Sequence, residues 1–209
     1  MTQVLLAIDT SSGTAVAVLV DGVAVSETYE PDTMQHAEQI GLQIQKALDA
    51  AGKKSSDVTI VAVGLGPGPF TGLRVGIAAA KMFAEGVGAA IIGVGSLDAI
   101  AFSKELSEPT LVLTDARRSE VFFGLYQGKS AAGSPKNLLG PGVKKQVDLE
   151  AELQTSGQKY EIVSGSISAA AVGLLALAQL AEGTANSSIV ANYLRAPDAV
   201  PAKGKKVSG

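Results

Sequence analysis

The segment GPGPFTGLRVG, residues 66–76, decides the expected fold because it joins an apolar run to a helical pattern. Residues 58–65 are predicted to form a buried strand, residues 71–85 a helix, and residues 89–94 a second strand. Strand, helix and strand at this spacing are typical of a parallel βαβ unit. The segment therefore predicts an α/β protein with a glycine-rich turn at one edge of its sheet.

Two interpretations of this glycine segment follow from its chemistry. Backbone N–H groups at a helix N-terminus attract anions, and Gly68 and Gly72 would let a phosphate come close. The segment is no Walker A loop, because Leu73 stands where a lysine is needed. The other interpretation is a tight strand-to-helix turn with Thr71 as N-cap. Arg74 opposes the helix dipole in the first turn, so we expect it to meet a carboxylate or a phosphate.

Residues 1–106 predict one lobe with the element order βββαβαβα. Three apolar runs separated by polar turns predict antiparallel strands at residues 4–8, 15–20 and 23–29. Asp21-Gly22 fits a two-residue hairpin turn, whose backbone needs positive φ. Apolar residues at helical spacing predict a helix over residues 37–51, with Asp32 or Thr33 as its cap.

Residues 107–209 predict a smaller second lobe that ends in a flexible basic tail. Two strands are expected on either side of a charged turn at residues 115–120, and residues 127–145 are expected to form a long loop because they are rich in Gly, Pro, Ser and Lys. The remaining predicted elements are a helix at 148–155, a strand at 160–163 and a helix at 168–181 that closes this lobe. The tail carries Lys203, Lys205 and Lys206.

Composition and charge narrow the class of protein. Apolar residues make up 46 % of the 209 residues and charged residues 18 %, which predicts a globular chain. The chain has no cysteine, which agrees with a location in the reducing cytosol. Its start lacks the basic region that is typical of secretory signals. Its longest uncharged apolar stretch, residues 167–181, is shorter than the roughly 18 to 20 residues of a membrane span. The net charge of −3 predicts weak RNA binding by the chain alone.

Two polar turns contain candidate phosphate-binding residues. The turn DTSSGT, residues 9–14, joins the first two strands, and such a hairpin reaches nucleotide phosphates in actin-like folds. Asp9, Thr10 and Ser12 are its candidates, and an ordinary polar turn is an equal alternative. Asp115 occupies the equivalent turn of the second lobe, where a charged, solvated turn is favoured.

His36 is the single histidine of the chain. No serine of the sequence sits in a Gly-x-Ser-x-Gly elbow, and Ile40, four residues on from His36, cannot bind a metal. We therefore expect His36 to lie on the surface at the start of its helix rather than in a catalytic or metal site.

Several of these segments together resemble the TsaB (YeaZ) family. They are LLAIDTS at residues 5–11, His36, the glycine segment, DARR at residues 115–118 and NYLR at residues 192–195. The resemblance implies an actin-like ASKHA (ribonuclease H-like) fold with two lobes, the second reduced. It also implies a role in forming N6-threonylcarbamoyladenosine at position 37 of tRNAs that read codons beginning with A. One departure is Pro69, where the family usually has serine, which removes a hydroxyl and an amide donor.

The resemblance further implies a non-catalytic, cytoplasmic subunit whose partner is TsaD. The catalytic TsaD carries a His-x-x-x-His metal motif, and the matching residues 36–40 here lack the second histidine. The implied assembly includes the TsaE ATPase, a homodimer when the chain is alone, and tRNA contacted only indirectly. No cofactor is expected to bind tightly, although ADP or ATP would fit at the interface with TsaD. The expected interface residues are His36 and seven small or apolar helix residues: Ile40, Ile44, Gly72, Leu73, Gly76, Ile77 and Ala80.

Two alternatives from other classes remain at this point. A stand-alone phosphotransferase, such as an acetate or sugar kinase relative, would use the same loops near Asp9, Gly66 and Asp115. A metalloprotease follows only from an old label of the family, and the missing ligand beside His36 argues against it.

Overall fold

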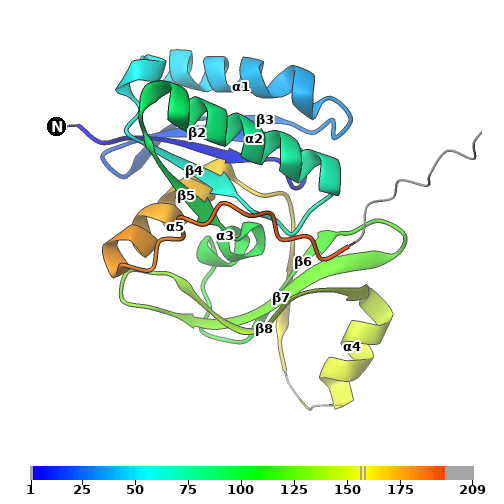
Figure 1. Cartoon of the computed structure of the whole chain (residues 1–209). Helices are drawn as coiled ribbons and strands as arrows, with labels where there is room; N and C mark the ends of the chain where they lie inside the picture. Colours follow the sequence, from blue (N-terminus) through cyan, green and yellow to red (C-terminus); the bar gives the residue numbers. More distant parts are fainter. Residues whose placement is uncertain (1, 156, 158, 196–209) are drawn as a thin grey trace, which may run out of the picture.

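The computed structural model describes residues 2–155, 157 and 159–195, and it stacks two sheets between layers of helices (Figure 1). The first sheet has the strand order β3-β2-β1-β4-β5 and the second β8-β7-β6-β9. Helices α1 and α2 cover the outer face of the first sheet, α3 and α5 lie between the sheets, and α4 covers the outer face of the second. The predicted tail lysines, Lys203, Lys205 and Lys206, lie outside the described residues.

The first sheet confirms the predicted βββ and βαβ arrangement. β1, β2 and β3 pair antiparallel, whereas β4 and β5 continue the sheet in parallel with β1. Asp21 and Gly22 have φ values of 47° and 80°, as the predicted hairpin turn requires. The strands are β1 Val4–Asp9, β2 Thr14–Val20, β3 Val23–Glu30, β4 Ile60–Gly64 and β5 Ala90–Val94.

The two outer helices form where predicted, but their predicted caps are wrong. α1 spans His36–Ala50 and follows Gln35, while the Asp32 carboxylate accepts a hydrogen bond from the Met34 N–H instead. α2 spans Phe70–Val87 and follows Pro69, so Thr71 lies inside the helix. Proline fixes a φ compatible with helix entry, which lets Pro69 begin α2 without a side-chain cap. A short 3₁₀ turn, η1, spans Ser55–Asp57.

The helices between the sheets hold the two lobes together. α3 spans Ser96–Phe102 and α5 spans Ala169–Glu182. The prediction that α5 closes the second lobe is wrong in its packing, since α5 lies against β1 and β2 of the first sheet. A Cβ at Gly173 would lie 2.7 Å from Leu19 Cδ1, so the glycine permits this close approach. No helix among the described residues has both the length and the hydrophobicity of a bilayer span.

The second sheet corrects the predicted loop at residues 127–145. This stretch forms the end of β7 and all of β8, which pair antiparallel with several register shifts. Edge strands and bulges tolerate Gly and Pro, so the composition that predicted a loop fits this edge strand. The elements are β6 Thr110–Asp115, β7 Glu120–Lys129, β8 Pro135–Lys145, α4 Gln146–Thr155 and β9 Glu161–Ser164.

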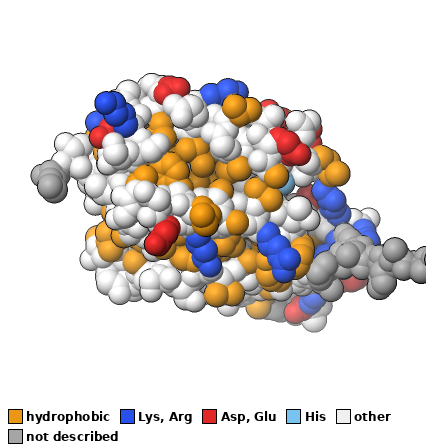
Figure 2. Space-filling view, turned by 45° about the horizontal axis from the view of Figure 1, so that its top comes forward, with side chains coloured by type: hydrophobic (Ala, Val, Ile, Leu, Met, Phe, Trp, Pro, Cys, Tyr) orange, Lys and Arg blue, Asp and Glu red, His pale blue; other side chains and the backbone are white. Residues whose placement is uncertain are grey.

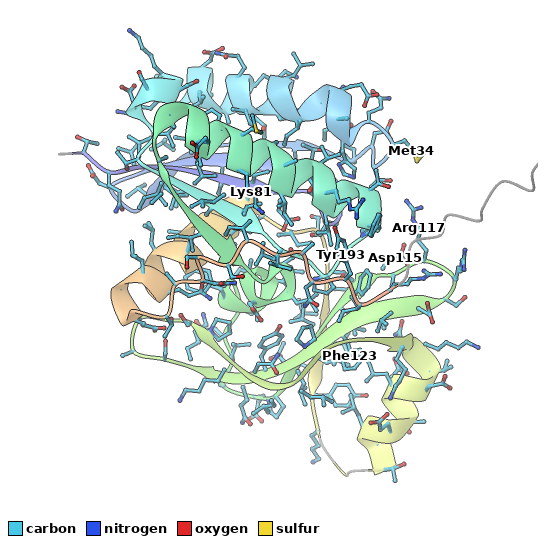
Figure 3. The ribbon with its side chains drawn as sticks, in the orientation of Figure 1. Met34, Lys81, Asp115, Arg117, Phe123 and Tyr193 are labelled. Atoms are coloured by element: carbon cyan, nitrogen blue, oxygen red, sulfur yellow. The ribbon has the colours of Figure 1, made fainter. Side chains whose placement is uncertain are left out.

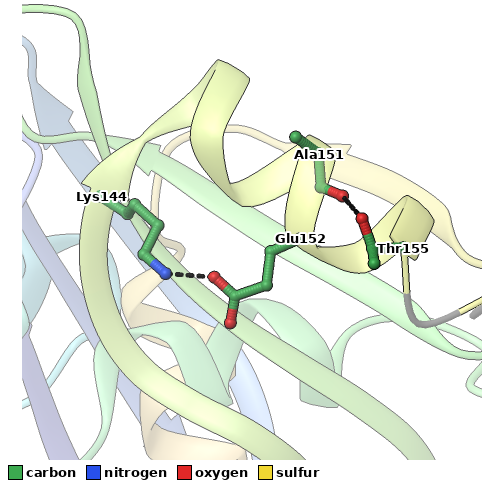
Figure 4. Close-up of polar contacts among 4 residues, drawn as sticks. All are labelled: Lys144, Ala151, Glu152 and Thr155. Atoms are coloured by element: carbon green, nitrogen blue, oxygen red, sulfur yellow. Dashed lines mark hydrogen bonds and ion pairs between the residues drawn. The ribbon is translucent and has the colours of Figure 1, made fainter.

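Helix α4 is attached to the second sheet by apolar and polar contacts. Leu149 and Leu153 are buried against it, and Lys144 of β8 forms an ion pair with Glu152 (Figure 4). Thr155 Oγ1 donates to the Ala151 carbonyl at 2.8 Å in the last turn (Figure 4).

Candidate functional site

The glycine segment and the β1–β2 turn pack directly against each other at the carboxyl end of β1. A Cβ at Gly68 would lie 2.6 Å from Ser11 Cβ, and one at Gly76 would lie 2.1 Å from Thr10 Oγ1. At Gly72 it would lie 2.5 Å from the Thr10 carbonyl oxygen. These distances are too short for any side chain, so the three glycines bring the start of α2 into contact with the turn.

Asp9 lies beneath this contact and is 1 % exposed. Its Oδ1 accepts hydrogen bonds from the Ser11 N–H at 2.8 Å and from Ser11 Oγ at 2.5 Å, and its Oδ2 accepts from Ser96 Oγ at 2.6 Å. Burial raises the pKa of Asp9, and the hydrogen bonds from Ser11 and Ser96 oppose that rise. Both carboxylate oxygens therefore have partners within the protein.

The hydroxyl groups of the same turn are also used internally. Thr10 Oγ1 donates to the Gly72 carbonyl at 2.8 Å, and Ser12 Oγ accepts from the Ile167 N–H at 3.3 Å. Asp9, Thr10 and Ser12 are thus brought together with the glycine segment. The contacts observed are those of a packed turn.

His36 is buried, so its predicted surface position is wrong. Its side chain is 5 % exposed, and Nδ1 lies 2.8 Å from Thr14 Oγ1. Burial lowers the pKa of His36, while the nearby charges of Asp32 and Asp9 oppose that shift. The sequence held a signal for this position, since His36, Ile40 and Ala47 recur on one face of α1 and are all buried.

Arg74 meets aromatic side chains rather than the expected carboxylate. Its guanidinium lies 3.9 Å from the Phe70 ring centroid, and its Nε donates to the Tyr193 hydroxyl at 3.2 Å. The rings of Phe70 and Tyr193 are 4.7 Å apart. Thr71, another predicted anion ligand, is exposed in the first turn of α2.

Residues 184–195 form a C-terminal strap that the sequence did not reveal. The strap runs along β5, where the Gly93 N–H donates to the Asn186 carbonyl at 2.8 Å, and the Asn192 N–H donates to the Leu65 carbonyl at 2.7 Å. Arg195 then donates to the Ala116 carbonyl at 2.5 Å. The strap therefore connects the glycine segment to the turn between β6 and β7 (Figure 3).

That turn places Asp115 on the surface. Its Oδ1 accepts a hydrogen bond from the Arg117 N–H at 2.8 Å, and its side chain is exposed beside Arg117 (Figure 3). Arg117, Arg118 and Ser119 have φ values of 62°, 54° and 61°, which non-glycine residues rarely adopt. Asp115 is thus the end of a strained, solvated turn and is not buried with Asp9.

The residues predicted for the partner interface belong mostly to the core. Leu73 and Ala80 are fully buried, and Ile40 and Ile77 are each 8 % exposed. Gly72 and Gly76 face the β1–β2 turn, so their small size serves a contact within the chain. Of the predicted set, Ile44 alone is half-buried.

Other apolar residues of α1 and α2 face outward. Met82 is 73 % exposed, Ala78 is exposed, and Val75 and Ala79 are half-buried. Figure 2 shows apolar side chains gathered on this side of the molecule, with charged side chains around them. We call Gly41, Ile44, Val75, Ala78, Ala79 and Met82 the α1/α2 face.

Two sheets separated by helices, with the β1–β2 turn against a glycine-rich strand-to-helix turn, define an actin-like α/β protein. A family model described as "TsaD: tRNA N6-adenosine threonylcarbamoyltransferase" matches residues 30–134, about half of the chain. The chain belongs to the TsaB (YeaZ) family and contains the domain that this model describes.

The chain is also similar to individual proteins and solved structures. An uncharacterised protein of Mycobacterium tuberculosis is 34 % identical over 94 % of this chain and 93 % of its own. The Escherichia coli protein named tRNA threonylcarbamoyladenosine biosynthesis protein TsaB is 33 % identical over 59 % of this chain and 54 % of its own, so the match spans just over half of that relative. A solved structure of YeaZ from Pseudomonas aeruginosa has a TM-score of 0.75 at 25 % identity, covering 92 % of this chain and all of that one.

Proposed function

We propose that this chain is a non-catalytic subunit that binds and supports a TsaD-type transferase. That transferase would form N6-threonylcarbamoyladenosine at position 37 of tRNAs that read codons beginning with A. The relatives from Escherichia coli and Bacillus subtilis named as tRNA threonylcarbamoyladenosine biosynthesis proteins support this role. The role implies a cytoplasmic location.

The observation that carries the non-catalytic assignment is the contact between the glycine segment and the β1–β2 turn. An actin-like phosphotransferase needs space there for nucleotide phosphates. In this chain Gly68 lies against Ser11, and Gly76 lies against Thr10. The Asp9 carboxylate and the Thr10 hydroxyl already have protein partners. A phosphate would have to separate the two segments and break these hydrogen bonds, which disfavours the phosphotransferase alternative.

A subunit without its own chemistry acts through surface contact, and the α1/α2 face is suited to that. Met82 is flexible and adapts to different partner surfaces, while Gly41 and Ala78 allow another helix to approach closely. We assign this face to TsaD in the heterodimer and to a second copy of the chain when TsaD is absent. The TsaE ATPase joins the assembly that contains TsaD.

Nucleotide binding is assigned to the assembly rather than to the lone chain. Pro69 lacks an amide donor, and the glycine segment is packed against Ser11 and Thr10. ADP or ATP would then bind at the junction with TsaD, where the partner supplies further ligands. Calorimetry with ATP and Mg²⁺ should show binding by the complex and none by the chain alone.

A depletion experiment tests the proposal as a whole. Cells depleted of this chain should lose N6-threonylcarbamoyladenosine from their tRNA, measured by mass spectrometry of nucleosides, and the parent gene should restore it. The TsaD protein purified without this chain should lose activity. Normal levels of the modified nucleoside after depletion, or phosphate transfer from ATP by the lone chain, would refute the proposal.

A further inference from the structure

All four arginines of the chain lie in one region of the molecule, whereas its other basic side chains, apart from the single histidine, are lysines. Arg74 contacts Tyr193 of the C-terminal strap. Arg195, at the end of the same strap, contacts Ala116, which directly precedes Arg117 and Arg118. A continuous series of contacts thus joins them. We call Arg74, Arg117, Arg118 and Arg195 the arginine cluster.

The arginine cluster includes aromatic surface as well as positive charge. The Arg74 guanidinium lies over Phe70, and the adjacent Tyr193 ring is 41 % exposed. Arginine binds phosphate through two parallel N–H donors and stacks on planar rings, which a lysine ammonium cannot do. Guanidinium groups beside an exposed ring are the combination with which proteins bind unpaired bases and the RNA backbone.

The turn between β6 and β7 presents two members of the cluster outward. Arg117 and Arg118 are both exposed, on a backbone held at positive φ. Arg117 reaches towards the first lobe, where its Nη2 lies 3.5 Å from Thr33 Oγ1. The Asp115 carboxylate accepts a hydrogen bond from the Arg117 N–H, and the Glu120 carboxylate lies 3.8 Å from Arg195.

This cluster contrasts with the charge of the whole chain, which is −3. A protein with net negative charge repels polyanions in general, so a local group of arginines favours one contact site and one orientation. We propose that the arginine cluster binds the sugar–phosphate backbone of an RNA. Under the proposed function, on which this identity rests, the RNA is the tRNA substrate. The chain would then contact tRNA directly, contrary to the expectation drawn from its composition.

The proposed RNA contact and the proposed protein contact meet only on α2. Arg117 and Arg118 come from the second sheet, which contributes nothing to the α1/α2 face. Arg74 precedes Ala78 and Met82 by one and two turns of α2, so it lies on the same side of this helix, at the edge of the α1/α2 face. Because Arg117 and Arg118 lie outside the α1/α2 face, the protein partner and the RNA can bind at the same time, and the chain would help to orient the tRNA on the assembly.

Affinity for an unmodified, labelled tRNA transcript that reads a codon beginning with A tests the proposal. It is measured for the complex with TsaD from the same organism and for the lone chain, over a range of salt concentrations. The test variant is Arg117→Gln/Arg118→Gln, which keeps a polar side chain and removes the charge. Arg117→Lys/Arg118→Lys keeps the charge and removes the planar fork. The matched control is Lys53→Gln/Lys54→Gln, which follows α1 at the opposite end of the first sheet.

The glutamine pair should weaken tRNA binding at least about tenfold at moderate salt and reduce the slope of affinity against salt by about one to two. The tRNA affinity of the lysine pair should lie between that of the parent and that of the glutamine pair. The control should change the affinity less than about twofold. Equal affinity of parent and glutamine pair, or an equal loss in the control, would overturn the proposal. So would loss of TsaD co-purification with unchanged tRNA affinity. If TsaD does not co-purify with the parent, the proposed function fails, and the titration of the lone chain still decides the RNA contact.

Discussion

Gly76 of α2 and Thr10 of the β1–β2 turn are in such close contact that a Cβ on Gly76 would lie 2.1 Å from Thr10 Oγ1. Thr10 cannot move away easily, because it is 1 % exposed and its hydroxyl donates to the Gly72 carbonyl. The contact fixes α2 against the first hairpin. It also accounts for the glycine at a helix position where alanine would otherwise be preferred.

We expect Gly76→Ala to lower the free energy of unfolding by about 1–3 kcal/mol, because the added methyl group overlaps Thr10. Urea denaturation measures the change. Gly86→Ala is the matched control in the same helix, since nothing lies within 4 Å of its Cβ position. It should stabilise the protein by roughly 0.5–1 kcal/mol. Equal effects at the two positions would show that the Thr10 contact is not close. Thr10→Ala should reduce the cost of Gly76→Ala.

The order of strands and helices could be predicted because it depends on local patterns. Alternating and helical spacing of apolar residues marks β1 to β5 and α1 and α2 without knowledge of tertiary contacts. β8 was mistaken for a loop because Gly140 and Pro141 suit a bulged edge strand as well as a turn, and only pairing with β7 separates the two.

The candidate site was harder to predict because its contacts join distant parts of the chain. Thr10 and Gly72 are candidate ligands from separate segments, and nothing in the sequence shows that the Thr10 hydroxyl donates to the Gly72 carbonyl. The apolar pattern of α1 and α2 predicts a buried face, but it does not show which other residues are exposed and could bind a partner. Tyr193 was missed as well, since its contact with Phe70 spans more than half of the chain.

Asp9→Asn should change the pH dependence of stability. Burial raises the pKa of Asp9 above its ordinary value of 3.8 in the folded state, so the folded protein binds this proton more tightly than the unfolded chain. The contribution of Asp9 to stability is therefore full below that ordinary value and declines as the pH rises through the folded pKa. The amide that replaces the carboxyl group cannot ionise, so the variant should gain stability relative to the parent between about pH 4 and about pH 7. Urea unfolding at both values measures the difference, and a constant difference would contradict the assignment.

Tyr126→Phe should destabilise the contact between α3 and the second sheet. The Tyr126 hydroxyl donates to Asp98 Oδ1 at 2.7 Å, and Tyr126 is completely buried. Burial raises the pKa of Asp98, and the hydrogen bond from Tyr126 opposes that rise. Removing the donor leaves a carboxylate without this partner, at a cost of about 1–3 kcal/mol in thermal or urea unfolding. Tyr29→Phe, at an exposed tyrosine that donates to the Ser12 carbonyl, should cost about 0.5 kcal/mol, and an equal cost would argue against the buried pair.

Met82→Asp should separate partner binding from folding. Met82 is 73 % exposed on the α1/α2 face, so a carboxylate there meets water in the free chain and a desolvated apolar surface in the complex. We expect co-purification with TsaD to fall at least about tenfold while the unfolding midpoint stays within the range of ordinary surface substitutions. Val147→Asp, 70 % exposed on α4, is the matched control and should keep the partner. Ala80→Asp places a charge in a fully buried position and should unfold the chain instead. Retained co-purification of folded Met82→Asp would move the interface away from these helices.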